Sequence, residues 1–197
     1  MNLRDTIEAL CGRVLREKDK LTELDQAVGD GDIGANLERG ANSILGLLAK
    51  VDPNASTRIL LVEVAKALNA AGCGTGGTLI SIGILAGAAR SDSLQDFCEA
   101  ALAKIQASGK AQPGEKTMVD ALLPAVQALR DGGSIEKAAV AARKGSEKTA
   151  EMVGTKGRSL YSQTRAQGVA DPGAYLVAAL FDEAAHLPKE PTDEKDH

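Results

Sequence analysis

Apolar residues recur every three or four positions through most of the chain, which is the spacing of one buried helix face. The first such run extends from Leu3 to Leu15 and predicts an amphipathic helix that fades near Lys20. The same spacing predicts seven further helices, at 36–50, 56–71, 77–90, 92–107, 114–130, 134–152 and 172–187. The pattern therefore predicts an all-α protein with eight helices.

Turn-forming residues separate these segments, as at Asp52-Pro53 and at Pro113-Gly114. The run Ile59–Val62 alone would suit a buried strand, but it continues directly into a strongly helical stretch, so we expect a helix there. The tail 188–197 has two prolines and many charges, and we expect it to be mobile. The remaining residues, 1–187, are long enough for one sizeable core and are predicted to form a single domain.

Composition excludes several classes of function. Two Phe, two Tyr, no Trp and a net charge of −4 argue against a nucleic-acid partner, which needs stacking aromatics or a basic face. Three widely spaced cysteines suit neither a disulfide framework nor a zinc site. No apolar run approaches the roughly 18 residues of a membrane span, and no leader is recognisable. We therefore expect a cytoplasmic protein with no membrane span.

Three carboxylates, of Asp25, Asp30 and Asp32, fall within eight residues and are interleaved with glycines. Two carboxylates about 4 Å apart repel by roughly 4 kcal/mol at an effective dielectric near 20, so their convergence calls for a cation. Oxygen ligands without His or Cys favour Mg²⁺, Ca²⁺ or Mn²⁺. An EF-hand starting at Asp30 fails, because Gly34 and Ala35 stand where an acid or amide and a glycine are required. The alternative is a solvated turn in which Asp32 or Asn36 caps the next helix.

Two other connections carry candidate chemistry. The segment Gly72–Gly77 lies between two predicted helices, so its amides and the Thr75 hydroxyl are candidates to hold phosphate; the alternative is close helix packing. It contains a GxGxxG match, but no strand precedes it. Lys156, Arg158 and Arg165 concentrate positive charge in the last long loop, where they either face phosphate or form a solvated surface.

Taken together, these motifs resemble the L subunit of dihydroxyacetone kinases and the equivalent domain of the single-chain ATP-dependent kinases, over nearly the whole chain. The most specific element is Leu24-Asp25 followed by Gly29-Asp30-Gly31-Asp32-x-Gly34-x-Asn36 and Arg39-Gly40. The supporting elements are Gly74-Thr75-Gly76-Gly77, Gly114-Glu115-Lys116-Thr117-Met118-Val119-Asp120-Ala121-Leu122, Gly157-Arg158 and Asp171-Pro172-Gly173-Ala174.

The resemblance implies an eight-helix antiparallel up-and-down barrel with a nucleotide site at one rim. It implies that Asp25, Asp30 and Asp32 are the catalytic residues and hold two Mg²⁺ ions that bridge the phosphates of ADP or ATP. It gives Met118 the role of a wall for adenine. The residues implied to line the nucleotide are Ile33, Gly34, Ala35, Asn36, Thr75, Gly76, Gly109, Met118, Arg158, Asp171, Pro172 and Gly173. Two positions depart from the family pattern, which usually has His at Ile33 and often Ser at Gly76.

The resemblance also implies a phosphoryl-transfer function. The chain would be one subunit of a kinase that phosphorylates a hydroxyketone or short sugar held on a separate K subunit. In one branch ADP stays bound and is rephosphorylated by a phosphohistidine carrier of the sugar phosphotransferase system; in the other, ATP is consumed. A homodimer is left open. The alternative function is a non-catalytic, nucleotide- or metal-responsive regulatory protein that binds a partner.

Overall fold

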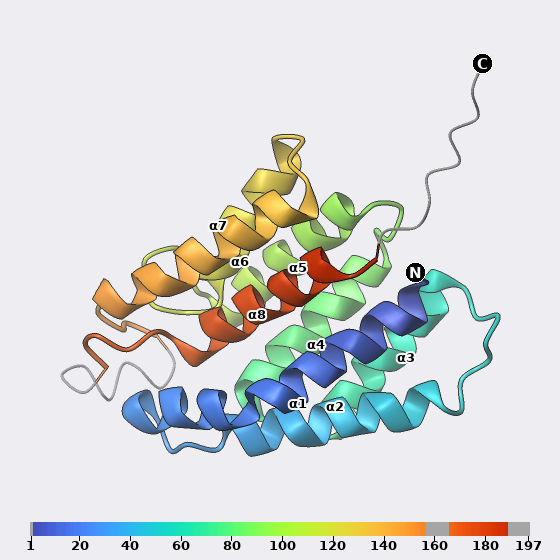
Figure 1. Cartoon of the computed structure of the whole chain (residues 1–197), viewed down its shortest axis with the longest axis horizontal. Coiled ribbons are helices and arrows are strands. Elements are labelled where there is room, and N and C mark those ends of the chain that lie inside the picture. Colours follow the sequence, from blue (N-terminus) through green and yellow to red (C-terminus); the bar gives the residue numbers. More distant parts are fainter. Residues whose placement is uncertain (1, 157–165, 189–197) are drawn as a thin grey trace.

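The protein is a closed ring of helices (Figure 1). The structure is a computed structural model that describes residues 2–156 and 166–188, and within these ranges it contains helices and no strand. The helices are α1 (Leu3–Val28), α2 (Ile33–Leu48), α3 (Thr57–Ala70), α4 (Gly74–Ala88), α5 (Leu94–Gly109), α6 (Val119–Arg130), α7 (Ile135–Lys148) and α8 (Pro172–His186), and a 3-10 turn η1 (Thr149–Glu151) extends α7. Each helix packs on the next and α8 packs on α1. The predicted all-α, eight-helix architecture is confirmed.

The up-and-down order gathers four connections at one end of the ring, which we call the site rim. These are the connections α1–α2, α3–α4, α5–α6 and α7–α8, and they lie toward the left of Figure 1. The other three connections lie at the opposite end, together with the start of α1 and the end of α8. Among the described residues, every segment that the sequence singled out for chemistry therefore belongs to the same rim.

Three clusters of buried apolar side chains hold the ring together. One unites α1 to α4 around residues such as Leu48 and Val64, and a second unites α5 to α8 around Val119 and Val126. The third consists of Leu21, Leu37 and Leu176, with Ile33 packed against it. This third cluster joins α1, α2 and α8. Its member Leu21 lies about one helical turn before Asp25 in α1, so the cluster packs close to the α1–α2 connection.

The first predicted helix boundary is wrong in a way that matters for the site. Helix α1 does not fade near Lys20 but continues to Val28, because Leu21, Leu24 and Val28 extend its buried face. Leu21 is completely buried. As a result Asp25 is held on a helix and only Asp30 and Asp32 lie beyond its end.

Other boundaries shift by a few residues. Helix α2 starts at Ile33 rather than 36, and α4 starts at Gly74 rather than 77. Helix α6 starts at Val119 rather than 114, since Gly114 (φ 88°) and Lys116 (φ 60°) adopt left-handed backbone conformations that end regular helix. The segment 59–62 lies in α3, which confirms its helical prediction. None of the described helices is long and apolar enough to cross a membrane.

Candidate functional site

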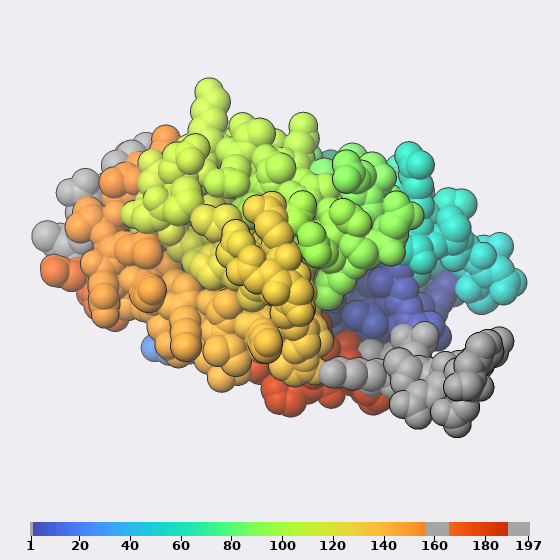
Figure 2. Space-filling model, turned by 90° about the horizontal axis from the view of Figure 1, so that it is seen from above, coloured from blue at the N-terminus to red at the C-terminus, as the bar shows by residue number. Residues whose placement is uncertain are grey.

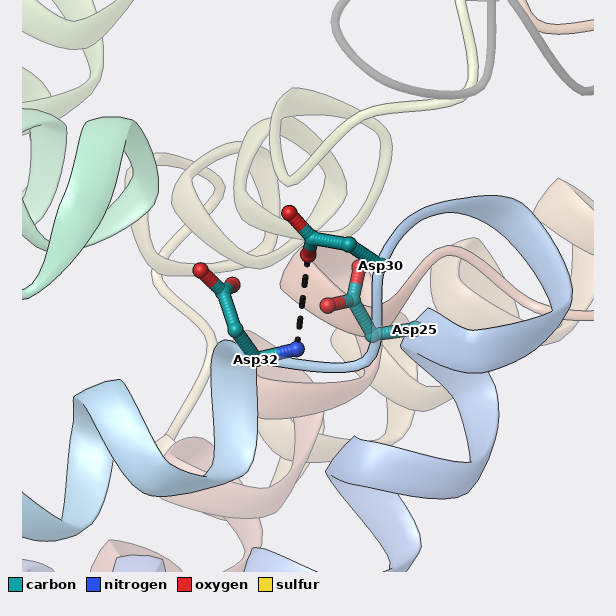
Figure 3. Close-up of side chains that lie close together, drawn as sticks. All are labelled: Asp25, Asp30 and Asp32. Carbon is teal, nitrogen blue, oxygen red and sulfur yellow. Dashed lines mark hydrogen bonds between the residues drawn. The ribbon is translucent and has the colours of Figure 1, made fainter.

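The three predicted aspartates converge at the site rim (Figure 3). Asp25 comes from the last turn of α1 and is 3% exposed, Asp30 lies exposed in the connecting loop, and Asp32 occupies the N-cap position of α2. One carboxylate oxygen of each lies within 4.8 Å of the other two. A helix end, a loop and a helix start thus each supply one acid to the same small volume.

Main-chain hydrogen bonds fix this loop. The Ile33 amide donates to Oδ2 of Asp25 at 3.2 Å, and the Asp32 amide donates to Oδ1 of Asp30 at 3.4 Å (Figure 3). Gly31 has a φ of 75°, which L side chains adopt only at a cost, so a glycine here allows the chain to reverse between Asp30 and Asp32. The loop backbone therefore sets where the carboxylates point.

The donor set suits a hard divalent cation. Its candidate ligand atoms are all carboxylate oxygens, which is the chemistry that Mg²⁺ and Ca²⁺ prefer. Three carboxylates this close repel one another, and solvent screens the charge of the buried Asp25 least. The capping alternative for Asp32 is wrong, since its side chain makes no capping hydrogen bond, and Asn36 lies inside α2 rather than at its start.

Gly34 has a packing role that the sequence did not reveal. It is buried in the first turn of α2, and a Cβ placed on it would lie 2.1 Å from Thr22 Oγ1 and 2.3 Å from the Lys18 carbonyl oxygen. The start of α2 therefore lies directly against α1. The side chain of its neighbour Ile33 packs into the third apolar cluster, so Ile33 faces the acids through its main-chain amide.

The α3–α4 glycine turn lies against the start of α2. The guanidinium of Arg39 donates to Asn36 Oδ1 and, at 3.1 Å, to the Gly72 carbonyl oxygen, so it connects the two segments. A Cβ on Gly74 would lie 3.3 Å from Asn36 Nδ2. Thr75 is exposed and a Cβ on Gly76 would meet nothing within 4 Å, which leaves open space above the first turn of α4. Helix starts present amides that have no acceptor within the helix and attract anions.

Of the remaining predicted residues, Met118 and those at the start of α8 form a second group. Met118 precedes α6 and is 9% exposed, and its Cβ lies 3.3 Å from a Cβ placed on Gly173. Gly173 follows Asp171, the N-cap of α8, and the buried Pro172. Gly109 ends α5, where a Cβ would lie 3.4 Å from a methyl group of Leu79. Met118 and the start of α8 thus form two walls in contact.

In this group, the Asp171 carboxyl has a pKa that is shifted far from its ordinary value. Burial raises the pKa of its carboxyl to about 7, although the Ala174 amide and Lys116 stabilise the charged form and act in the opposite direction. Its Oδ2 accepts the Ala174 amide at 2.8 Å, which caps α8. A carboxyl group with this pKa changes charge near neutral pH.

Several residues of this rim were missed as functional candidates. Lys116 and Asp120 belong to the family motif Gly114–Leu122, but the sequence predicted no role for either. Lys116 is 1% exposed, and Asp120 accepts hydrogen bonds from the main-chain amides of Gly114 and Thr117. Arg39 also belongs to a family motif for which no role of its own was predicted. Nothing in the sequence distinguishes these charged residues from surface ones. Arg158 and Arg165 lie outside the described residues, while Lys156 lies within them.

Comparisons with known proteins agree with this geometry. A relative from Listeria innocua, the ADP-binding subunit DhaL of PEP-dependent dihydroxyacetone kinase 1, is 35% identical over 175 residues, which cover 86% of this chain and 87% of the relative. The L-erythrulose 1-kinase of Mycolicibacterium smegmatis is 34% identical over 192 residues, 90% of this chain and 33% of that kinase. The chain thus spans about a third of the length of that larger relative.

Two solved structures share the fold. The dihydroxyacetone kinase of C. freundii in its native form superposes with a TM-score of 0.80 and 26% identity, over 94% of this chain and 34% of that one. The same kinase in complex with AMP-PNP and Mg²⁺ gives a TM-score of 0.76 and 28% identity over the same shares. The DAK2 domain family matches residues 27–186. The resemblance drawn from the motifs is therefore confirmed, and the chain belongs to the DAK2 domain family.

Proposed function

We propose that this chain is the nucleotide-binding, phosphoryl-transferring subunit of a dihydroxyacetone-type kinase. The observation that carries the proposal is the meeting of Asp25, Asp30 and Asp32 within 4.8 Å at the rim of a DAK2 fold. A solved relative with this fold is in complex with AMP-PNP and Mg²⁺. Phosphoryl transfer depends mainly on positioning and on neutralising phosphate charge, and both are within reach of a rigid acidic loop.

The three carboxylates would hold two Mg²⁺ ions. When bound, these ions would neutralise charge on the nucleotide phosphates. Asp25 would be the inner ligand, because it is buried and its second oxygen is already oriented by the Ile33 amide. Asp30 and Asp32, toward solvent, would be the outer ligands. The loop would thus present a charge pattern that exists before the nucleotide arrives.

The rest of the rim would bind the nucleotide itself. The start of α4, with Thr75 and Gly76, would receive the phosphates through main-chain amides. A Cβ placed on Gly76 would meet nothing within 4 Å, so the serine that is common in the family would also fit at this position. Met118 and the segment 171–173 would enclose the base and ribose. Arg158 is assigned to this site from the family pattern.

The hydroxyketone or short sugar would be held on a separate K subunit. Within the part of the chain that the structure describes, no histidine lies at this rim to anchor a substrate covalently. His186 lies at the end of α8 on the opposite side, with Nδ1 2.7 Å from the Asp182 carbonyl oxygen. The three free, buried cysteines suit a reducing compartment, in keeping with a cytoplasmic enzyme.

The similarity to an ADP-binding subunit of a PEP-dependent enzyme supports rephosphorylation of bound ADP by a phosphohistidine carrier.

Reconstitution tests this function. The purified chain is mixed with a K subunit and dihydroxyacetone, and product is measured with ATP or with phosphoenolpyruvate and the phosphocarrier proteins. We expect turnover with the phosphocarrier, and none when Asp30→Asn replaces the wild-type chain. Turnover with ATP alone would support the kinase function but would identify ATP, rather than the phosphocarrier, as the phosphate donor. Nucleotide binding without turnover from either donor would favour the regulatory alternative.

A further inference from the structure

Lys116 is a buried charge that the phosphoryl-transfer chemistry does not use. Its side chain is 1% exposed, and its backbone has a φ of 60°, a conformation that costs energy for a residue with a side chain. A lysine is almost never fully buried unless its ammonium is satisfied. A strained, buried lysine in the α5–α6 connection therefore needs a structural reason.

The reason is a set of three main-chain carbonyl groups. Nζ donates to the carbonyl oxygen of Thr149 at 2.6 Å, of Ala166 at 2.9 Å and of Val169 at 2.7 Å. An ammonium has three protons, so its hydrogen-bonding capacity is fully used. Figure 2 shows the two connecting segments meeting at one end of the molecule, the first yellow-green and the second orange. Lys116 thus fastens the α5–α6 connection to the described parts of the α7–α8 connection.

The charge is accommodated by its surroundings. Thr149 follows directly on the last turn of α7, where carbonyl groups point outward and a cation is favoured. Burial lowers the pKa of the Lys116 ammonium, while the charge of Asp171 opposes that shift. Thr149 makes a second link, because its hydroxyl accepts the Asp171 amide at 2.8 Å. The residue before α8 is therefore tied to the end of α7 and, through it, to Lys116.

These links end at the two walls of the second site group. Met118 lies two residues after Lys116. Asp171 lies two residues after Val169, whose carbonyl oxygen accepts a hydrogen bond from Lys116. Between the walls, Met118 Cβ lies 3.3 Å from a Cβ placed on Gly173. The position of one wall relative to the other is thus set by a hydrogen-bonded connection that passes through a single ammonium group.

We infer that Lys116 is a positioning residue for nucleotide binding, which fixes Met118 against the start of α8 without touching the nucleotide. The inference rests on the proposed function, in which these walls enclose the base and ribose. Lys116 acts on one half of the site only, since its three partners all lie in the α7–α8 connection and none in the aspartate loop.

The first test compares Lys116→Met with Lys104→Met. Lys104 is exposed on α5, so the control removes the same charge without disturbing the rim. Affinity for ADP with Mg²⁺ is measured by calorimetry, well below each melting temperature. We expect Lys116→Met to bind ADP at least about tenfold more weakly, as a displaced wall requires, and Lys104→Met to match wild type. Mn²⁺ binding to the aspartates, followed by electron paramagnetic resonance, should stay within about twofold for both.

A gentler pair of variants covers the case in which Lys116→Met does not fold. Gly168 (φ 80°) lies between Ala166 and Val169, while Gly132 (φ 73°) lies at the opposite end of the ring. A Cβ on either would meet nothing within 4 Å, so alanine adds the same backbone strain at both places. We expect similar losses of melting temperature, but weaker ADP binding only in Gly168→Ala.

The outcomes separate this inference from the proposed function. Unchanged ADP affinity in Lys116→Met, or in Gly168→Ala where the lysine variant does not fold, overturns the positioning role while wild-type binding upholds the nucleotide site. An equal loss of Mn²⁺ and ADP affinity also overturns it, because the effect is then not confined to one half of the site. Absence of ADP and ATP binding by the wild-type chain overturns both.

Discussion

The main-chain amide of Ile33 donates a hydrogen bond to Oδ2 of Asp25 at 3.2 Å. The bond joins the first residue of α2 to a buried carboxylate near the end of α1, so it closes the loop that carries Asp30 and Asp32. One oxygen of Asp25 is thereby oriented by the backbone. We take this hydrogen bond as the reason that a three-acid cluster can persist at the rim. Because Asp30 is exposed in the loop, a substitution there tests the site with the least effect on the fold.

Asp30→Asn should abolish Mg²⁺-dependent ADP binding and leave the fold intact. The substitution keeps the size of the side chain, removes one of three converging charges, and affects an exposed loop position. Calorimetry with and without Mg²⁺ measures the loss, and circular dichroism monitors the helices. Asp92→Asn is the control, since Asp92 is exposed in the α4–α5 connection at the opposite end. Unchanged ADP affinity in Asp30→Asn would contradict the metal assignment.

Gly34→Ala should destabilise the protein by about 2 kcal/mol or more, because the new methyl group would overlap the Lys18 carbonyl oxygen and the Thr22 hydroxyl. Gly46→Ala, exposed in the same helix with nothing within 4 Å of the new Cβ, should instead stabilise by about 0.5 to 1 kcal/mol. Urea unfolding of both variants measures the difference. Equal stabilities would show that α2 does not pack on α1 as closely as the structure has it.

The pKa of Asp171, raised to about 7 from an ordinary 3.8, predicts a pH dependence of stability. Between these two values the native state binds more protons at this group than the unfolded state, so its contribution to stability falls as the pH rises. Asp171→Asn cannot ionise and retains an oxygen to cap α8. The free energy of unfolding of wild type relative to this variant should therefore decrease from about pH 4.5 to about pH 7.5.

Urea titrations of both proteins at several pH values measure this difference. The comparison with Asp171→Asn removes the contributions of all other titrating groups that the two proteins share. A difference that stays flat, or that increases with pH, would mean that the Asp171 carboxyl is better solvated or better paired than the structure indicates.

Much of the fold was predictable from the sequence because helix periodicity is a local signal. All eight helices follow from it, and the connections that the motifs occupy meet at one rim as the family resemblance implies. The largest error, the early end of α1, arose near the aspartate motif. There Leu21, Leu24 and Val28 continue the helical spacing, but the glycines that follow suggested a longer loop.

The site was predictable only in part. Asp25, Asp30 and Asp32 could be named in advance because they lie within eight residues and are separated by glycines, although the packing of α1 on α2 is what brings their carboxylates together. The roles of Gly34 and Lys116 depend on neighbours 12 or more residues away, which no local pattern records. Lys116 in particular has the sequence signature of a surface lysine, and only the fold places three carbonyl groups around its ammonium.

Native mass spectrometry of the purified wild-type chain, incubated with ADP in the presence and absence of Mg²⁺, tests the central claim most directly. The account predicts a species that carries one ADP and two Mg²⁺ ions, and loss of the nucleotide when the metal is chelated. A chain that binds ADP equally well without metal, or that binds no nucleotide under either condition, would contradict the claim that the cluster of Asp25, Asp30 and Asp32 holds a metal-bound nucleotide.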